Sequence, residues 1–217
     1  MSETKEIATI DNEELQKEIE FQKTLSPEEN AKRVIELKTK IGFDTLTGLK
    51  NKDRITDQME TIEILFKRNG EKYCVLFVDV DNLKRINDTE GHDRGNEVIS
   101  SVALALKEGT KRGSDLVGRW TRGDEFVVVL LEAGDDGAYT YYKRLNDIFK
   151  SKKELNNISL SIGASTCDFK EQRGNKKFLD VVGEADQAMY KAKERKEERS
   201  GNVGLIFYNE INKNEQK

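Results

Sequence analysis

The chain has 217 residues, of which 36% are charged and 35% hydrophobic, and its formal net charge is -4 at pH 7. This length allows one well-buried domain of about 150 to 180 residues with a short extension, and it is too short for two ordinary domains. The negative net charge gives no reason to expect nucleic acid as a partner. No apolar run approaches the roughly 18 residues of a membrane-spanning helix, and the N-terminus lacks a signal-peptide pattern, so we expect a cytoplasmic protein without membrane contact.

Scarce histidine and cysteine limit the chemistry that this chain can perform. His92 is the only histidine, which leaves almost nothing for a Ser-His mechanism or for a zinc site built from histidines. Cys74 lies in an apparent buried strand and Cys167 follows another, so we expect two reduced thiols in or near the core.

Residues 1–42 are predicted to form a helical extension, since they contain no strand pattern. Ser26, Pro27 and Glu29 combine an N-cap serine, a proline at the first helical position and a glutamate three residues after the cap. This combination predicts a helix over residues 27–41. Its partial apolar stripe could pack on the core or on a second copy of the same helix, and the sequence leaves both possibilities open.

Strands and helices alternate in the remainder of the chain. Their order, βαββαβ with additional elements, predicts an α+β fold with a ferredoxin-like, palm-type core, in which an antiparallel sheet carries helices on one face. We assign this domain to residues 43–210 and a polar C-terminal tail to residues 211–217. The expected elements are a buried strand over 73–80, a helix over 95–111, a hairpin of strands 116–120 and 126–131, a helix over 139–149, a strand over 158–164, a helix over 178–192 and a short strand over 203–208.

Two pairs of acidic residues lie at the ends of predicted strands. Asp79 and Asp81 end the first strand, and residues two apart in a strand point to the same side, so both carboxylates could converge on one hard cation. The alternative is a strand that simply continues into a polar loop. Asp124 and Glu125 occupy the hairpin turn, and if the hairpin lies beside the first strand, one of them reaches Asp79. Three such carboxylates would form the Mg²⁺ site of a palm-type phosphoryl-transfer enzyme.

Four motifs in order resemble those of a known family, the GGDEF-domain diguanylate cyclases, over about residues 43–208. The resemblance implies an enzyme that acts as a homodimer and condenses two GTP molecules into cyclic di-GMP with release of pyrophosphate. The motifs are DTLTGLKN at Asp44 to Asn51, the segment from Phe77 to Asp93, the hairpin from Arg119 to Phe126, and ADQAMYKAK at Ala185 to Lys193.

The resemblance also implies roles for individual residues. Mg²⁺ or Mn²⁺ would be held by Asp79, Asp124 and the Val80 carbonyl, and Glu125 would lie close to the reacting hydroxyl as a second catalytic acid. Lys84 and Lys193 would bind the triphosphate tail, and Lys84 would also be a catalytic residue. Gly123 would lie beside the phosphates, and Arg199 or Lys196 would make a further phosphate contact. Asn87 would bind the purine edge, Leu46 would contact the purine face, and Asn96 would distinguish the base. Because each domain would bind one triphosphate, two domains must meet, and the N-terminal helix would hold or regulate the pair.

Arg112 and Asp115 resemble the RxxD motif of the family's product-inhibition site. An arginine fork there could grip a guanine edge or a phosphate, so that bound cyclic dinucleotide locks the domains apart. The alternative for so short a pattern is ordinary surface charge.

Three features depart from the family pattern. Arg122 replaces the first glycine of the hairpin signature, but Gly123 and both acids remain, so we expect activity to be retained. Asn96 replaces an aspartate that reads guanine, and an amide offers guanine one acceptor while turning a donor toward a donor. Asparagine is also a natural partner of adenine, so we expect GTP to be preferred while ATP gives some mixed cyclic GMP-AMP. An insertion of roughly three residues after Lys193 leaves the second phosphate contact open between Lys196 and Arg199.

Two alternatives belong to other functional classes. The domain could be a degenerate regulator that binds GTP or cyclic dinucleotide without turnover, a possibility that the altered hairpin raises. It could also be a dimerisation and interaction module built on the N-terminal helices.

Overall fold

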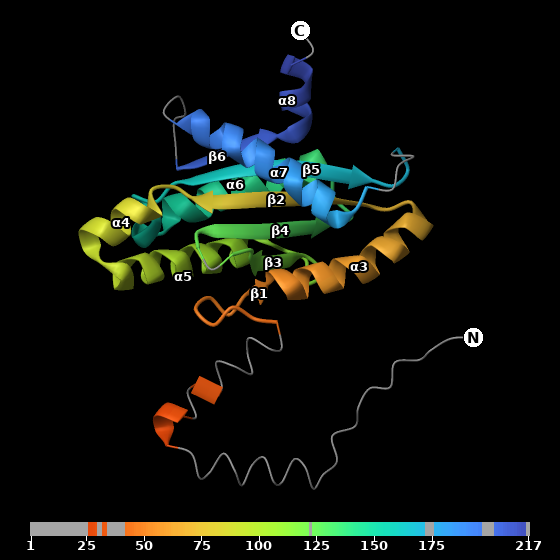
Figure 1. Ribbon diagram of the computed structural model, residues 1–217. Coiled ribbons are helices and arrows are strands. Elements are labelled where there is room, and N and C mark those ends of the chain that lie inside the picture. Colours follow the sequence, from red (N-terminus) through yellow and green to blue (C-terminus); the bar gives the residue numbers. More distant parts are fainter. Residues whose placement is uncertain are drawn as a thin grey trace, which may run out of the picture.

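The computed structural model of the chain describes residues 26–29, 32–33, 42–121, 123–171, 176–196 and 202–215. Within them a six-stranded sheet has the order β1-β3-β4-β2-β5-β6 (Figure 1). The elements are β1 (Lys50–Asn51), α3 (Lys52–Asn69), β2 (Lys72–Val80), α4 (Leu83–Glu90), α5 (His92–Gly109), β3 (Leu116–Arg119), β4 (Glu125–Leu131), α6 (Asp135–Ser151), the 3-10 turn η1 (Lys153–Leu155), β5 (Leu160–Asp168), α7 (Phe178–Glu194), β6 (Val203–Phe207) and α8 (Tyr208–Glu215).

The palm-type α+β core is confirmed, but the sheet is mixed. The central strands β3, β4, β2 and β5 pair antiparallel, as the βαββαβ order predicts. At the two edges, β1 pairs parallel with β3 and β6 pairs parallel with β5. The expectation of a wholly antiparallel sheet is therefore wrong at its edges, because the flanking strands return over helices rather than through hairpins.

Helices cover both faces of the sheet, which corrects the expectation that they pack on one face. Alternate residues of β2 join two separate cores, and Figure 1 shows α7 and α6 on opposite sides of the strands. Every residue of β2 from Tyr73 to Val80 is buried, and a strand buried on both sides needs a cover on each. Helices α3 and α4 were not predicted from the sequence, and Ile55 and Met59 of α3 complete the second cover beside α7.

A close approach of α7 to β5 fixes the height of this helix over the sheet. A Cβ added at Gly163 would lie 2.0 Å from both the Ala185 carbonyl oxygen and the Met189 nitrogen. Only a residue without a side chain allows the two backbones to meet in this way. The contact sets the position of the last turn of α7, which carries Lys193.

Several helix ends differ from the expected bounds. Helix α5 begins at His92, α6 begins at Asp135, and α8 occupies residues 208–215, where we expected a strand end and a polar tail. In α6 the first-turn acids Asp135 and Asp136 favour the earlier start, since negative charge stabilises a helix N-terminus.

Only a small part of the predicted N-terminal helix lies within the described residues. Ser26 and Glu29 form the expected capping box, in which Glu29 accepts hydrogen bonds from the Ser26 backbone N–H at 2.9 Å and from its hydroxyl at 2.7 Å. Residues 27–29 and 32–33 are helical. The rest of the predicted helix lies outside the described residues. Whether this helix packs on the core or on a second copy of itself is therefore not tested. In the described ranges no helix is both long and apolar enough to span a bilayer.

Candidate active site

The acids that end β2 lie next to the tip of the β3–β4 hairpin. In the sheet register Asp79 pairs with Glu125, and the Val80 N–H donates a hydrogen bond to the Asp124 carbonyl oxygen at 3.1 Å. The predicted adjacency of the hairpin to the first strand is confirmed. Asp79 and Glu125 also point to the same face of the sheet, because they are directly opposite each other on neighbouring strands.

Asp81 is engaged by two serine hydroxyls, although it lies near enough to Asp79 to add to the rise of the Asp79 pKa. Its buried carboxylate accepts hydrogen bonds from the Ser159 hydroxyl at 2.7 Å and the Ser161 hydroxyl at 2.8 Å. The spacing rule fails because β2 ends at Val80 and the chain then turns through Asn82, which has a φ of +60°. Among the described residues, no three His, Cys, Asp or Glu side chains are grouped so that they could hold a metal ion.

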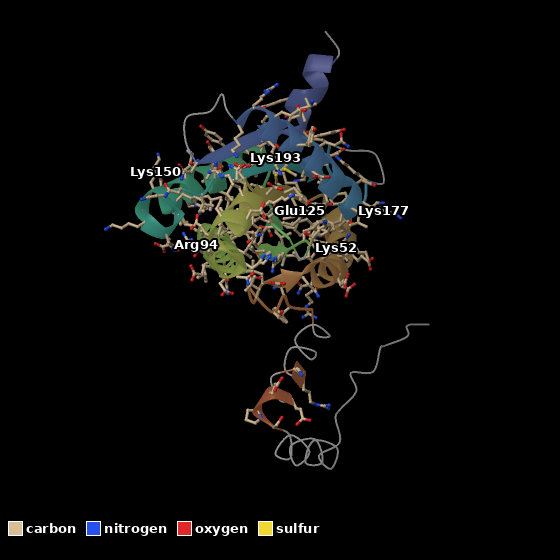
Figure 2. The ribbon with its side chains drawn as sticks, turned by 60° about the vertical axis from the view of Figure 1, so that its left-hand side comes forward. Lys52, Arg94, Glu125, Lys150, Lys177 and Lys193 are labelled. Carbon is tan, nitrogen blue, oxygen red and sulfur yellow. The ribbon has the colours of Figure 1, made fainter. Side chains whose placement is uncertain are left out.

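Two lysines at the end of α7 face these carboxylates. The Lys193 Nζ lies 2.8 Å from Asp79 Oδ1 and donates a hydrogen bond to it. Figure 2 labels Lys193 of α7 and Glu125 of β4. The Lys196 Nζ lies 4.0 Å from Asp81 Oδ2. The described structure thus places Lys196 beside this cluster, whereas Arg199 lies outside the described residues, so the choice between them as a phosphate contact stays open.

Burial and mutual repulsion govern the charges at the site. Burial raises the pKa of Asp79 above its ordinary value, Asp124 adds to the rise, and the hydrogen bond from Lys193 opposes it. Burial also raises the pKa of Glu125, against a hydrogen bond from Thr121 and together with repulsion from Asp124. For Lys193, burial disfavours the ammonium, but the hydrogen bond to Asp79 outweighs it and raises the pKa. A cation bound near these neighbouring carboxylates would therefore stabilise their ionised forms.

The donor set fits a hard divalent cation. The predicted ligands Asp79, Asp124 and the Val80 carbonyl offer only oxygen atoms, which Mg²⁺ and Mn²⁺ prefer. The expected cluster of three carboxylates is not found among the described residues, and the ligand set that the family resemblance implies contains two carboxylates and one carbonyl. The ammonium already bonded to Asp79 shows that this position attracts a cation.

The predicted base-binding residues come from the α4–α5 pair. Asn87 lies on α4, and its side-chain amide packs against Gly95 of α5. A Cβ added at Gly95 would lie 1.9 Å from the Asn87 Oδ1, so this contact requires glycine. Asn96 follows Gly95 and is exposed. Lys84, in the first turn of α4, is also exposed. The structure therefore brings the two predicted amides onto neighbouring helices.

Leu46 lies beside the base of the hairpin. It is 37% exposed and lines a cavity of about 440 Å³ together with Trp120 and Thr121. Across this cavity the Lys52 ammonium lies 4.9 Å from the centre of the Trp120 ring, a cation–π contact. Leu46 is thus available to a flat ligand.

Arg119 is a site residue to which the sequence analysis gave no role. Its buried guanidinium donates hydrogen bonds to both carboxylate oxygens of Asp44, at 3.2 and 3.3 Å, and to the Gly123 carbonyl, at 3.0 and 2.8 Å. It therefore ties the DTLTGLKN turn to the hairpin tip. An arginine at the end of an apolar strand was the available signal, since a buried guanidinium requires partners.

Arg112 and Asp115 lie together at the far end of β4. The Arg112 Nη1 donates a hydrogen bond to the Leu131 carbonyl at 3.0 Å, and the Leu131 N–H donates one to Asp115 Oδ1 at 3.1 Å. Burial raises the pKa of Asp115. The two side chains hold the backbone C=O and N–H of Leu131 at the strand end, and Arg112 remains exposed. Arg122 of the hairpin lies outside the described residues.

A mixed sheet with acids at the end of one central strand and at the tip of the adjacent hairpin defines a palm-type nucleotide cyclase. Within this class, the chain belongs to the GGDEF-domain family of diguanylate cyclases, since the family model described as "Diguanylate cyclase, GGDEF domain" matches residues 41–199. The chain is 34% identical to the diguanylate cyclase DosC of Escherichia coli K12 over 161 residues, which cover 71% of this chain and 34% of DosC. It therefore spans about a third of the length of this relative.

Solved structures are similar over most of the chain. The diguanylate cyclase SiaD of Pseudomonas aeruginosa, solved in complex with its activator SiaC, has a TM-score of 0.65 and 25% identity, over 90% of this chain and 73% of SiaD. A microbial GGDEF domain solved with cyclic di-GMP has a TM-score of 0.62 and 29% identity, over 79% of this chain and 99% of that domain.

Proposed function

We propose that this chain is a Mg²⁺-dependent diguanylate cyclase that condenses two GTP molecules into cyclic di-GMP and releases pyrophosphate. The observation that carries the proposal is the meeting of Asp79 at the end of β2 with Asp124 and Glu125 at the hairpin tip. Membership of the GGDEF family and the names of the relatives support the same reaction. The non-catalytic alternative rests on Arg122 in the altered hairpin, and the retained Asp79, Asp124, Glu125 and Lys84 argue against it.

The residues around the hairpin divide the chemical tasks. Asp79, Asp124 and the Val80 carbonyl would hold Mg²⁺ or Mn²⁺, which when bound stabilises the charge that develops on the phosphates and on the attacking 3′-oxygen. Glu125 would accept the proton of the 3′-hydroxyl, and its raised pKa improves it as a base at neutral pH.

Substrate binding draws on the surrounding elements. Lys84 and Lys193 would bind the triphosphate tail as point charges. Asn87 would hydrogen-bond the purine edge and Leu46 would contact its face, while Gly123 allows the phosphates to approach the hairpin backbone.

Since each domain would bind one triphosphate, the reaction requires a homodimer in which two sites face each other. Residues 1–42 would hold or regulate this pair, and cyclic dinucleotide bound at Arg112 and Asp115 would inhibit it. Both assignments are part of the proposal.

The test is to incubate the full chain with Mg²⁺ and GTP and to identify the products by mass spectrometry. Asp124→Ala and Glu125→Ala should each lower cyclic di-GMP formation by at least about 100-fold, while Asp147→Ala, an exposed acid on α6, should not. Nucleotide binding without any product in the unaltered chain would instead support the non-catalytic alternative.

Asn96 carries the expectation about base selectivity. In a mixture of GTP and ATP we expect cyclic di-GMP as the main product with some cyclic GMP-AMP, because an amide discriminates poorly against adenine. Asn96→Asp should raise the preference for GTP over ATP by about tenfold, since a carboxylate offers two acceptors to guanine. Complete exclusion of ATP by the unaltered chain would refute this part alone.

A further inference from the structure

The contact between Lys193 and Asp79 joins a partly exposed ammonium to a buried carboxylate. The Asp79 side chain is 7% exposed, whereas that of Lys193 is 45% exposed. A buried carboxylate is strongly destabilised without a counter-charge, so the ammonium neutralises a group that has lost most of its water. The Lys193 side chain, in contrast, is accessible to solvent.

The contact can break without any movement of the main chain. Helix α7 is held against β5 at Gly163, and Lys193 lies in its last turn. A lysine side chain has four methylene groups and many rotamers, so its ammonium can swing away while the helix stays in place. The lost ion pair would then have to be replaced at Asp79 by another cation.

The same carboxylate belongs to the proposed metal ligands. An ammonium that is hydrogen-bonded to Asp79 and a divalent cation on that carboxylate would repel each other at close range in a partly buried site. Lys193 therefore competes with metal for Asp79. The nearby Asp81 accepts hydrogen bonds from Ser159 and Ser161, and the Lys196 ammonium lies 4.0 Å from its carboxylate, so Asp79 is the acid to which the Lys193 ammonium is hydrogen-bonded.

We propose that Lys193 is the resident counter-cation of the metal site, and that its transfer from Asp79 to the triphosphate tail couples metal binding to nucleotide binding. The inference rests on the proposed function, and it adds that each ligand binds weakly alone. Nucleotide phosphates draw the ammonium away and free Asp79, and a cation on Asp79 releases Lys193 for the phosphates. By thermodynamic linkage, each ligand must strengthen the other by the same factor.

The test measures metal binding rather than turnover. Mn²⁺ is titrated into the full chain and the free ion is followed by electron paramagnetic resonance, first alone and then with a saturating GTP analogue whose α,β-bridging oxygen is a methylene group. A titration of the analogue without protein gives the Mn²⁺ that the analogue binds by itself, which is subtracted. The unaltered chain should bind Mn²⁺ at least about tenfold more tightly with the analogue than without it.

Lys193→Met removes the charge and keeps the length of the side chain. It should tighten the binding of Mn²⁺ alone by about tenfold, because the competing cation is gone, and the strengthening of Mn²⁺ binding by the analogue should shrink by a similar factor. Lys193→Arg retains a cation and should behave like the unaltered chain. Lys191→Met is the matched control, since Lys191 lies on the same helix but its ammonium pairs with Glu194.

Asp79→Asn separates failure of the inference from failure of the proposed function. If Asp79→Asn abolishes Mn²⁺ binding but Lys193→Met leaves the affinity for Mn²⁺ alone unchanged, the counter-cation role is overturned and the metal assignment stands. If Asp79→Asn does not weaken Mn²⁺ binding, the metal assignment itself is wrong, and the inference is overturned with it.

Discussion

At the scale of single residues, Arg119 shows how one buried charge can hold two motifs together. Its planar guanidinium reaches the Asp44 carboxylate on one side and the Gly123 carbonyl on the other, and only 8% of its side chain is exposed. Loss of either charged partner removes from the other buried charge the opposite charge that faces it, which costs more than the pair itself contributes.

We predict strong coupling between Arg119 and Asp44. Arg119→Met and Asp44→Asn should each destabilise the fold by about 2 to 4 kcal/mol. The double variant should cost less than the sum of the two single costs, by at least about 1 kcal/mol, because it leaves neither charge without its partner. Urea unfolding of the four proteins measures this cycle. Arg94→Met, which breaks an exposed surface pair with Glu97, should cost less than about 1 kcal/mol. Additive costs at Arg119 and Asp44 would contradict the role assigned to the pair.

Glu125 should show a conflict between stability and activity. Its pKa is raised in the folded protein, so its carboxylate destabilises the fold at neutral pH, and the fold gains stability as the pH falls and the group is protonated. Glu125→Gln should therefore raise the melting temperature at pH 7, by an amount that shrinks as the pH is lowered below the usual glutamate range, while turnover is lost. Calorimetry across this pH range checks the sign, and a destabilised variant at pH 7 would contradict it.

At the scale of elements, the height of α7 decides whether its lysines reach the site. This helix packs against β5 where Gly163 has no side chain, and a methyl group there would lie within the α7 backbone. The helix must then shift, and Lys193 moves with it.

Gly163→Ala should accordingly lower the free energy of unfolding by about 3 kcal/mol or more, as severe overpacking does. Gly183→Ala is the control, since Gly183 lies within α7 and an added Cβ there meets nothing within 4 Å. That variant should be neutral or stabilising by up to about 1 kcal/mol, because alanine favours the helix. Denaturant unfolding distinguishes the two, and equal stabilities would show that the close approach is not required.

At the scale of the whole molecule, one sheet places the proposed catalytic acids and the RxxD pair at opposite ends of β4. Glu125 begins this strand, and Leu131, which Arg112 and Asp115 hold, ends it. A cyclic dinucleotide bound at Arg112 and Asp115 would thus lie at the far end of β4 from the catalytic acids. It would inhibit the enzyme through the dimer rather than by direct contact with those acids.

The proposed homodimer makes activity depend on concentration. Product formed per chain should fall on about a hundredfold dilution, since two chains must meet for each product molecule. Initial rates of cyclic di-GMP formation, measured alongside light scattering, test this prediction. A constant rate per chain from a protein that scatters as a monomer would contradict it.

Much of the fold and part of the site could be predicted because their signals are local. The apolar run of β2 identified a central strand, Ser26 to Glu29 identified a helix start, and four short motifs identified the family. The neighbourhood of Asp79 and Glu125 followed from the strand order, because a hairpin beside β2 must bring its tip to the strand end. The rule that residues two apart in a strand point to the same side did not apply to Asp81, because Asp81 lies beyond the end of β2.

Periodicity and motifs in consecutive residues were enough to predict five of the six strands of the described sheet, the helices α5, α6 and α7 and the identity of the acids, but not β1, α3, α4 or α8. The packing of the whole chain was needed to show that helices cover both faces, that Arg119 bonds Asp44 across 75 positions and that Lys193 bonds Asp79 across 114. The physical reason is that a buried charge takes its partner from whatever packing brings near, and packing depends on the whole chain at once.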